Sequence, residues 1–105
     1  MKIIYSLERP KNIRLIEIIS DETEIVLPSH IDGVPVTSIE SYAFVKCRNL
    51  KKLTLPENIH WMSNKAFEKA PALQEIVFKG TEEEFYWEAH FDNAIPEGIT
   101  VTCEQ

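Results

Sequence analysis

The sequence has few glycines and cysteines, no long apolar segment and no excess of basic residues. Three glycines, at positions 33, 80 and 98, are too few for a glycine-rich loop that cradles phosphate groups. No apolar run approaches the roughly 18 residues of a membrane-spanning helix. The formal net charge of -6 argues against nucleic-acid binding, which requires a basic surface. We therefore expect one globular domain that neither inserts into membranes nor binds nucleic acid.

The two cysteines, Cys47 and Cys103, show neither metal-ligand spacing nor a C-x-x-C pair. Both fall at positions that the apolar pattern assigns to the core, where free cysteine is a common small residue. We predict buried free thiols in preference to a disulfide. At the start of the chain, MKIIYSLERPKNIRL is interrupted by charge and proline before any apolar region of signal-peptide length. From this chain alone we expect a cytoplasmic protein.

An internal repeat organises the middle of the chain. Its period, the separation of Ile39 from Met62, is about 23 residues and lies within the range of leucine-rich repeats, about 20–29 residues. A partial third copy brings Ile76 and Phe78 onto Ile99 and Val101. The matched apolar positions of the first two copies are Val36 and Ile59, Ile39 and Met62, Ala43 and Ala66, Phe44 and Phe67, Cys47 and Ala70, Leu50 and Leu73, Leu53 and Ile76, and Leu55 and Phe78.

Each repeat changes its apolar period halfway. Leu53 and Leu55 alternate with polar residues, which predicts a short strand with one face turned inward. Ala43, Phe44 and Cys47 stand at a spacing that fits one helical turn laid against that strand. Such a unit buries its apolar edge only by stacking on a neighbour, which predicts a solenoid.

The segment VTSIESYAFVKCRNLKKLTLP, residues 36–56, resembles the repeat of the BspA-like bacterial leucine-rich repeat proteins. That repeat runs approximately V-T-S-I-G-x-x-A-F-x-x-C-x-x-L-x-x-[VI]-x-[IL]-P, and Glu40 stands where glycine is usual. The second unit, IHWMSNKAFEKAPALQEIVF, is less faithful. The flanking segments EIVLPSHIDGVPVTSI and FKGTEEEFYWEAHFDNAIPEGITVTC are similar to the family's usual leading and closing segments. The resemblance covers about residues 15–103.

The predicted fold class is α/β: a short leucine-rich-repeat solenoid, a right-handed β/α superhelix of about two and a half 23-residue repeats. The single domain, residues 1–105, is divided into an N-terminal cap (1–35), repeat 1 (36–58), repeat 2 (59–80) and a C-terminal cap (81–105). IIYSLE and IRLIEI are expected to form a starting hairpin. The predicted core residues are Ile25, Leu27, Val36, Ile39, Ala43, Phe44, Cys47, Leu50, Leu53, Leu55, Ile59, Met62, Ala66, Phe67, Leu73, Ile76, Phe78, Phe85, Ile99 and Val101.

Candidates for catalysis are few. The histidines at positions 30, 60 and 90 lack a second ligand at metal spacing such as H-E-x-x-H. The acidic run 82–84 could be a paired-carboxylate or cation site. We favour the alternative that Thr81 is a helix N-cap and Glu84 completes a capping box. We predict no catalytic residue, no metal or cofactor site and no enzyme activity.

The outward residues of adjacent strands are expected to form rows on one face of the solenoid. The alternative is a solvated sheet face with mixed charges and no partner. The rows continue to Thr100 and Thr102, and the partner-binding candidates within them are Glu24, Val26, Lys52, Thr54, Glu75 and Val77.

A further binding candidate is Trp61, which stands where the first repeat has Ser38. Tryptophan is enriched among the residues that dominate interface energetics. The favoured alternative is that this side chain packs against the cap helix that carries Phe85, Tyr86 and Trp87.

The resemblance implies adhesion or protein contact at a bacterial surface, and hence a cell-surface or secreted location. We predict a non-enzymatic recognition module that binds a protein partner, or less readily a glycan, through its strand face. One alternative is an intracellular structural protein that self-assembles through its edges or Trp61. A remote alternative is a small hydrolase with Glu84 and His90. The sequence leaves the oligomeric state open.

Overall fold

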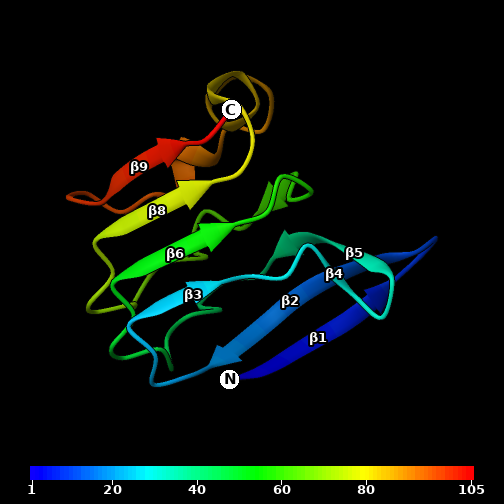
Figure 1. Cartoon of the computed structure of the whole chain (residues 1–105), viewed down its shortest axis with the longest axis horizontal. Helices are drawn as coiled ribbons and strands as arrows, with labels where there is room; N and C mark the ends of the chain where they lie inside the picture. Colours follow the sequence, from blue (N-terminus) through cyan, green and yellow to red (C-terminus); the bar gives the residue numbers. More distant parts are fainter.

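The computed structural model describes all 105 residues and contains two β-sheets (Figure 1), which share one apolar core. The first sheet runs in the order β1 (Lys2–Glu8), β2 (Asn12–Ile19), β5 (Val34–Ile39) and β4 (His30–Ile31), with β7 (Trp61–Met62) also paired to β5. The second sheet runs in the order β3 (Glu24–Val26), β6 (Lys52–Leu55), β8 (Glu75–Phe78) and β9 (Thr100–Cys103). All neighbouring strands of the second sheet are parallel.

Residues one repeat period apart in the sequence are paired on neighbouring strands in both sheets. In the second sheet Leu53 pairs with Ile76, and in the first sheet Ile39 pairs with Met62. Each repeat therefore adds one strand to each sheet. Of the two strands in each repeat, the apolar alternation had predicted only the second, such as the strand at 52–55. β7 has just two residues, which are too few to show a period.

The N-terminal hairpin is confirmed, and its second strand also belongs to the repeat stack. β1 and β2 are antiparallel, whereas β2 pairs in parallel with β5. Ile13 lies beside Val36, which is again one repeat period further along the chain. Ile13, Leu15 and Ile18 are fully buried and were absent from the predicted core. The segment before the first recognised repeat thus already supplies β2 and β3 to the two sheets.

The prediction of an α/β fold is wrong in its helical part, because strands dominate and little helix forms. The segment after β5 makes separate turns: the amide of Cys47 donates to the carbonyl of Phe44, and that of Leu50 to Cys47. Tyr42 adopts a φ of 59°, which a right-handed helix does not allow. Isolated i→i+3 turns and one turn of helix place apolar residues at the same spacing. The sequence pattern therefore could not distinguish these two structures.

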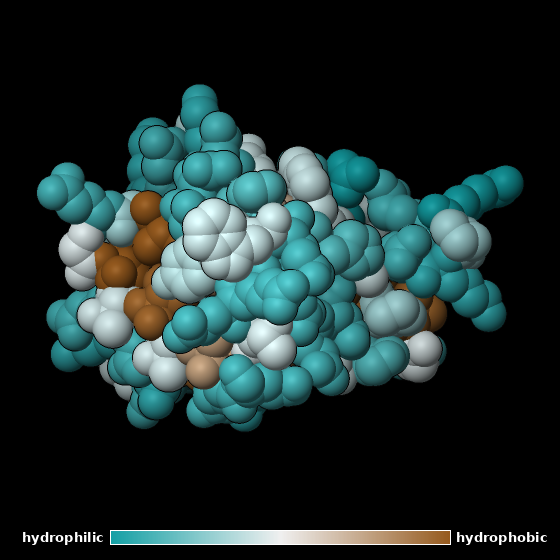
Figure 2. All heavy atoms as spheres, turned by 90° about the horizontal axis from the view of Figure 1, so that it is seen from above, coloured by the Kyte–Doolittle hydropathy of each residue, from teal (hydrophilic) through white to brown (hydrophobic).

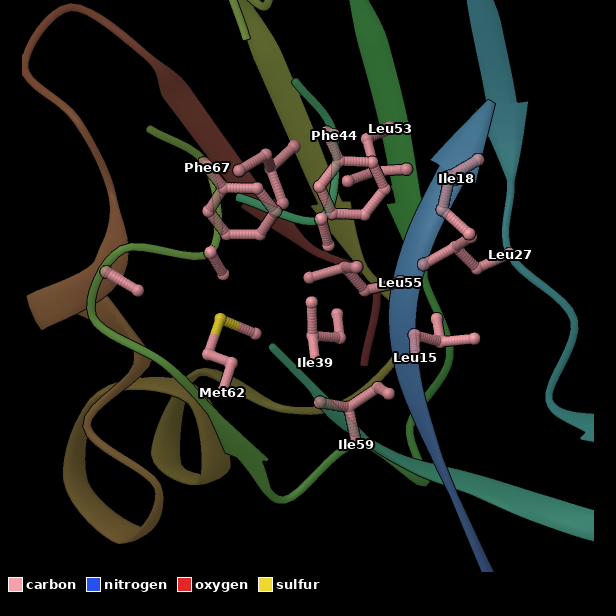
Figure 3. Packing of buried hydrophobic residues seen from close by; sticks show 14 of the residues in the cluster. Leu15, Ile18, Leu27, Ile39, Phe44, Leu53, Leu55, Ile59, Met62 and Phe67 are labelled. Carbon is pink, nitrogen blue, oxygen red and sulfur yellow. The ribbon is translucent and has the colours of Figure 1, made fainter. Parts of the chain in front are cut away.

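The core lies between the sheets and the turns, and its centre is visible in Figure 3. The rings of Phe44 and Phe67, equivalent residues of successive repeats, stack with centroids 5.5 Å apart (Figure 3). The predicted core residues are buried with two exceptions, Ile99 and Val101, which are partly exposed. Both precede or belong to β9, the last strand of its sheet, which has a neighbour on one side only.

The C-terminal cap covers the end of the stack with aromatic rings. Phe78 of β8 contacts Phe85 of η1 (Glu83–Glu88) and Phe91 of η2 (Phe91–Ala94), at centroid distances of 5.5 and 5.9 Å. Phe91 and its neighbour Ala94 are buried and were missed by the sequence prediction. Seen from the capped end, the surface is mostly hydrophilic apart from small groups of apolar residues (Figure 2). The cap thus closes the open core that a stacked repeat would otherwise leave.

Candidate binding surface

The outward side chains of the second sheet form two rows, because its strands are parallel and in register. One row contains Glu24, Lys52, Glu75 and Thr100. The other row contains Val26, Thr54, Val77 and Thr102. The residues of these two rows are called the strand face. The side-by-side order of β3, β6, β8 and β9 can be followed in Figure 1.

Two members of the strand face are buried, which corrects the expectation that the whole row is exposed. Thr54 and Val77 are only 8% and 5% exposed, whereas Val26 is 68% exposed. Thr54 and Val77 lie on the two inner strands and have neighbours on both sides, whereas Val26 lies on the edge strand β3. Alternation shows which way a side chain points, but not how far its neighbours shield it.

Apart from Val26, the accessible part of the strand face is polar, and three of its residues alternate in charge. Glu24, Lys52 and Glu75 follow one another across three strands, which places a cation between two carboxylates. A shallow hollow beside them is lined entirely by polar residues, namely Lys51, Lys52, Gln74, Glu75 and Thr100. Such a surface can form ion pairs and hydrogen bonds with a partner, and it lacks a nucleophile with an adjacent base.

Trp61 lies on the other sheet, so the structure does not bring it together with the strand face. It belongs to β7, where it pairs with Ser38. Trp61 is 48% exposed and borders η2, and its packing against the cap helix that carries Phe85, Tyr86 and Trp87 stays a prediction. There it borders a cavity of about 660 Å³ that Ala89, His90 and Asn93 also line.

A second hollow also borders Trp61 and was not anticipated from the sequence. Its lining residues are Glu8, Arg9, Asn12, Arg14, Thr37, Ser38, His60 and Trp61. Two carboxylates hold the Arg14 guanidinium there: Nη2 lies 2.7 Å from Glu8 Oε1 and Nη1 lies 3.0 Å from Glu40 Oε1. The predicted hairpin brings Glu8 near Arg14 and the repeat aligns Ser38 with Trp61, but the pairing of β2 with β5 that joins the two groups was not predicted.

Both cysteines are free, as predicted, but only Cys47 is fully buried. The Cys47 thiol donates to the carbonyl oxygen of Ile18 over 3.3 Å. Burial raises the pKa of Cys47, and burial likewise raises the pKa of Cys103. Neither thiol is therefore prepared to act as a thiolate nucleophile at neutral pH.

In the acidic run 82–84 of the cap, Glu84 forms a capping box with Thr81. Glu84 N–H donates to Thr81 Oγ1 over 3.1 Å, and Glu84 Oε1 accepts from the Thr81 hydroxyl over 3.1 Å and from its N–H over 3.4 Å. His90 lines the cavity beside Trp61, whereas Glu84 lines a different hollow with Glu57 and Glu88. No group of three or more His, Cys, Asp or Glu side chains has the geometry to hold a metal ion.

The structure contains no helix that is both long enough and apolar enough to cross a membrane.

Comparisons with known proteins agree with the repeat and with the fold. The family model for the BspA type leucine rich repeat region (6 copies) matches residues 19–99. The crystal structure of a T. pallidum leucine-rich repeat protein is similar with a TM-score of 0.66 and 21% identity, over 96% of this chain. This chain spans half of that protein.

A second structure, that of a leucine-rich cell surface protein from Faecalibacterium prausnitzii, aligns with a TM-score of 0.36 and 13% identity, over 98% of this chain and 38% of the other. No curated protein matches. The family match covers most of the chain, and its residues include both repeats and most of the strand face. The chain belongs to the BspA-type leucine-rich repeat family.

Proposed function

We propose that this chain is a non-enzymatic recognition module that binds a protein partner through the strand face. The observation that carries the proposal is the row Glu24–Lys52–Glu75, which alternates in charge across three parallel strands. A row on the partner in which each charge is reversed would form ion pairs with this row and fix the register of the complex. Leucine-rich repeat domains generally act as protein-interaction modules, which supports the choice of a protein as the partner.

The size of the strand face limits the affinity. Four strands spaced about 4.8 Å apart, each about 13 Å long, span a few hundred Å². A standard interface uses about 800 Å² from each partner. We therefore expect a transient complex, or a partner that also contacts the loops around the strand face.

The test compares a charge-swapped strand face with a matched control. The variant Lys52→Glu with Glu75→Lys changes the order of charges in the row and keeps the net charge. The control Lys65→Glu with Glu68→Lys makes the same exchange at two exposed residues of a turn. Each protein is immobilised and exposed to an extract of the cells that produce it, and the retained proteins are quantified by mass spectrometry.

We expect at least one protein to be retained by the wild type and the control and lost from the strand-face variant. Circular dichroism and the melting temperature verify that each variant is folded. Equal retention by a folded strand-face variant would exclude this surface. Val77→Glu is unsuitable for the test, because Val77 is buried and the charge would unfold the sheet.

A second candidate function, glycan binding, is favoured by the surroundings of Trp61. Its indole is half exposed and borders a hollow whose other lining residues are all polar or charged. An aromatic face beside hydrogen-bonding groups suits a sugar ring, which has both apolar C–H and hydroxyl groups. This site would act independently of the strand face.

Intrinsic fluorescence tests the glycan candidate directly. The chain has two tryptophans, so Trp87→Phe leaves Trp61 as the only indole. Cellotetraose and chitotetraose, titrated up to about 10 mM, should then produce a saturable change in emission. An emission spectrum that stays constant with both sugars would count against a glycan ligand.

A further inference from the structure

β1 has an unpaired edge. It is the first strand of its sheet and pairs only with β2 (Figure 1). Its charged residues, Lys2 and Glu8, stand at its two ends, and the residues between them are uncharged. The register shift in the hairpin places the extra residue, Ile16, on β2 and leaves β1 regular. β1 therefore lacks the central charges, prolines and bulges with which proteins protect an edge strand.

The core-side face of β1 is apolar and incompletely covered. Ile3, Tyr5 and Leu7 pair with the buried residues of β2, so they lie on the same side of the sheet as the core. Nevertheless Tyr5 is 39% exposed and Leu7 is 66% exposed. One more strand beside β1 would cover these side chains and satisfy the free backbone groups.

The sequence of β1 is complementary to itself when it is turned around. Consider two copies of β1 that pair antiparallel about a twofold axis at Tyr5. The residue number in one copy and the number of the residue that faces it in the other copy then add up to ten. Ile3 then faces Leu7 of the second copy, and Tyr5 faces Tyr5. Lys2 faces Glu8 of the second copy, which gives an ion pair at each end. Every core-side residue meets an apolar or aromatic residue, and every charge meets its opposite.

We propose that β1 is a homodimer interface, through which two copies of this chain pair antiparallel and join their first sheets. The contact is isologous and closes with two copies, so it does not propagate into a fibre. β1 has seven residues and is about 24 Å long, so the interface is smaller than a standard one and the dimer is reversible.

The dimer leaves the strand face of both copies free, because β1 belongs to the first sheet and the strand face to the second. Two strand faces on one particle would raise the apparent affinity for a partner that has repeated binding sites. This consequence matters because a single strand face is small. The dimer itself does not depend on the proposed function and is tested without a partner.

Sedimentation velocity of the full chain, from about 10 μM to about 1 mM, tests the proposal. The wild-type mass should rise with concentration from 12.1 kDa toward twice that value. Tyr5→Lys and Tyr5→Glu each place like charges opposite one another at the twofold axis. Each should raise the dissociation constant at least about tenfold. An equimolar mixture of the two variants should dimerise again, because lysine then faces glutamate.

Two further variants test whether the loss of the dimer is specific to substitutions in β1. Leu7→Lys removes another exposed apolar residue of β1 and should also weaken the dimer. Val26→Lys alters an equally exposed residue on the other sheet and should leave the mass unchanged. Circular dichroism verifies the fold of each monomer. A wild-type mass of 12.1 kDa at every concentration, or a dimer that Tyr5→Lys leaves intact, would overturn the proposal.

Discussion

At the scale of single residues, Cys47 illustrates how a repeat position tolerates different side chains. Its thiol is fully buried and donates to the carbonyl of Ile18. Ala70 occupies the equivalent position in the next repeat, so the turn also accommodates a side chain without sulfur. The thiol therefore contributes packing and one weak hydrogen bond. We expect Cys47→Ala to fold and to lose about 1 kcal/mol of stability.

Because the Cys47 thiol titrates, the free energy of unfolding depends on pH in the alkaline range. Burial raises its pKa above the ordinary value of 9.0, so the folded chain keeps the proton at pH values where the unfolded chain loses it. The contribution of Cys47 to the free energy of unfolding is therefore constant well below pH 9.0 and falls as the pH rises above that value. Urea denaturation of wild type and Cys47→Ala between pH 7 and about pH 10.5 isolates this contribution. A stability difference that stays constant across this range would contradict the assignment.

Gly80 is required by the packing of the cap. A Cβ atom at this position would lie 2.7 Å from Cζ of Phe78, whose ring is buried between Phe85 and Phe91 and has no room to move. We expect Gly80→Ala to cost about 1–3 kcal/mol by overpacking. Urea denaturation measures the cost. Gly98→Ala is the control for steric contact, because no atom lies within 4 Å of its Cβ position; its φ of 88° predicts backbone strain alone.

At the scale of elements, the hydrogen bonds between Thr81 and Glu84 stabilise the first turn of the helical segment that continues as η1. Thr81 and Glu84 satisfy each other's backbone and side-chain groups through three hydrogen bonds. Thr81→Ala should lower the free energy of unfolding by about 1 kcal/mol, and Thr81→Ser should lower it much less because it keeps the hydroxyl. Thermal denaturation of the three proteins compares them. Equal losses in both variants would show that the hydroxyl makes no contribution.

The elements also show what sequence patterns can and cannot predict. Strands β6 and β8 were predictable, because their apolar residues alternate and recur from one repeat to the next. The turn at Ser41–Cys47 was predicted as helix, since i→i+3 turns give the same apolar spacing. β2 and β3 were assigned to a cap because their segment lacks the A-F-x-x-C turn that identifies the later repeats.

The candidate site was predicted less completely than the fold. The strand-face residues were chosen from alternation, which predicts the side of the sheet correctly and the exposure of Thr54 and Val77 incorrectly. The hollow around Arg14 was missed, because the sequence indicated the β1–β2 hairpin and the repeat alignment of β5 with β7 but not the pairing of β2 with β5 that joins them. Repeats reveal internal packing because each copy repeats the same contacts, whereas surface residues vary between copies.

At the scale of the whole molecule, the stack is short enough to behave as one globular unit. Its radius of gyration is 12.5 Å, close to the roughly 13 Å expected of a globular domain of this length. One core cluster of 23 buried residues extends from Ile13 of β2 to Ala94 of η2. The caps and the repeats therefore depend on the same core.

A shared core predicts a single cooperative unfolding transition. Tryptophan fluorescence reports on β7 and the cap, because Trp61 and Trp87 are the only indoles, and far-ultraviolet circular dichroism reports on both sheets. The two urea transitions should coincide. Phe85→Ala should shift both midpoints together, with a loss of about 3–5 kcal/mol, because Phe85 is fully buried in the aromatic cluster. A cap that unfolds separately at lower urea would contradict the single core.

Side-chain footprinting of the complex shows whether the strand face is the surface that recognises a protein. The partner is the protein retained by the wild type and lost from Lys52→Glu with Glu75→Lys. Hydroxyl-radical labelling of the chain, with and without that partner, measures the protection of Val26, Trp61 and Leu7, which are all exposed in the free chain. We predict that Val26 on the strand face becomes protected, while Trp61 and Leu7 are labelled as before. Protection of Trp61 or Leu7 with Val26 unchanged would contradict the account and move the binding site to the first sheet.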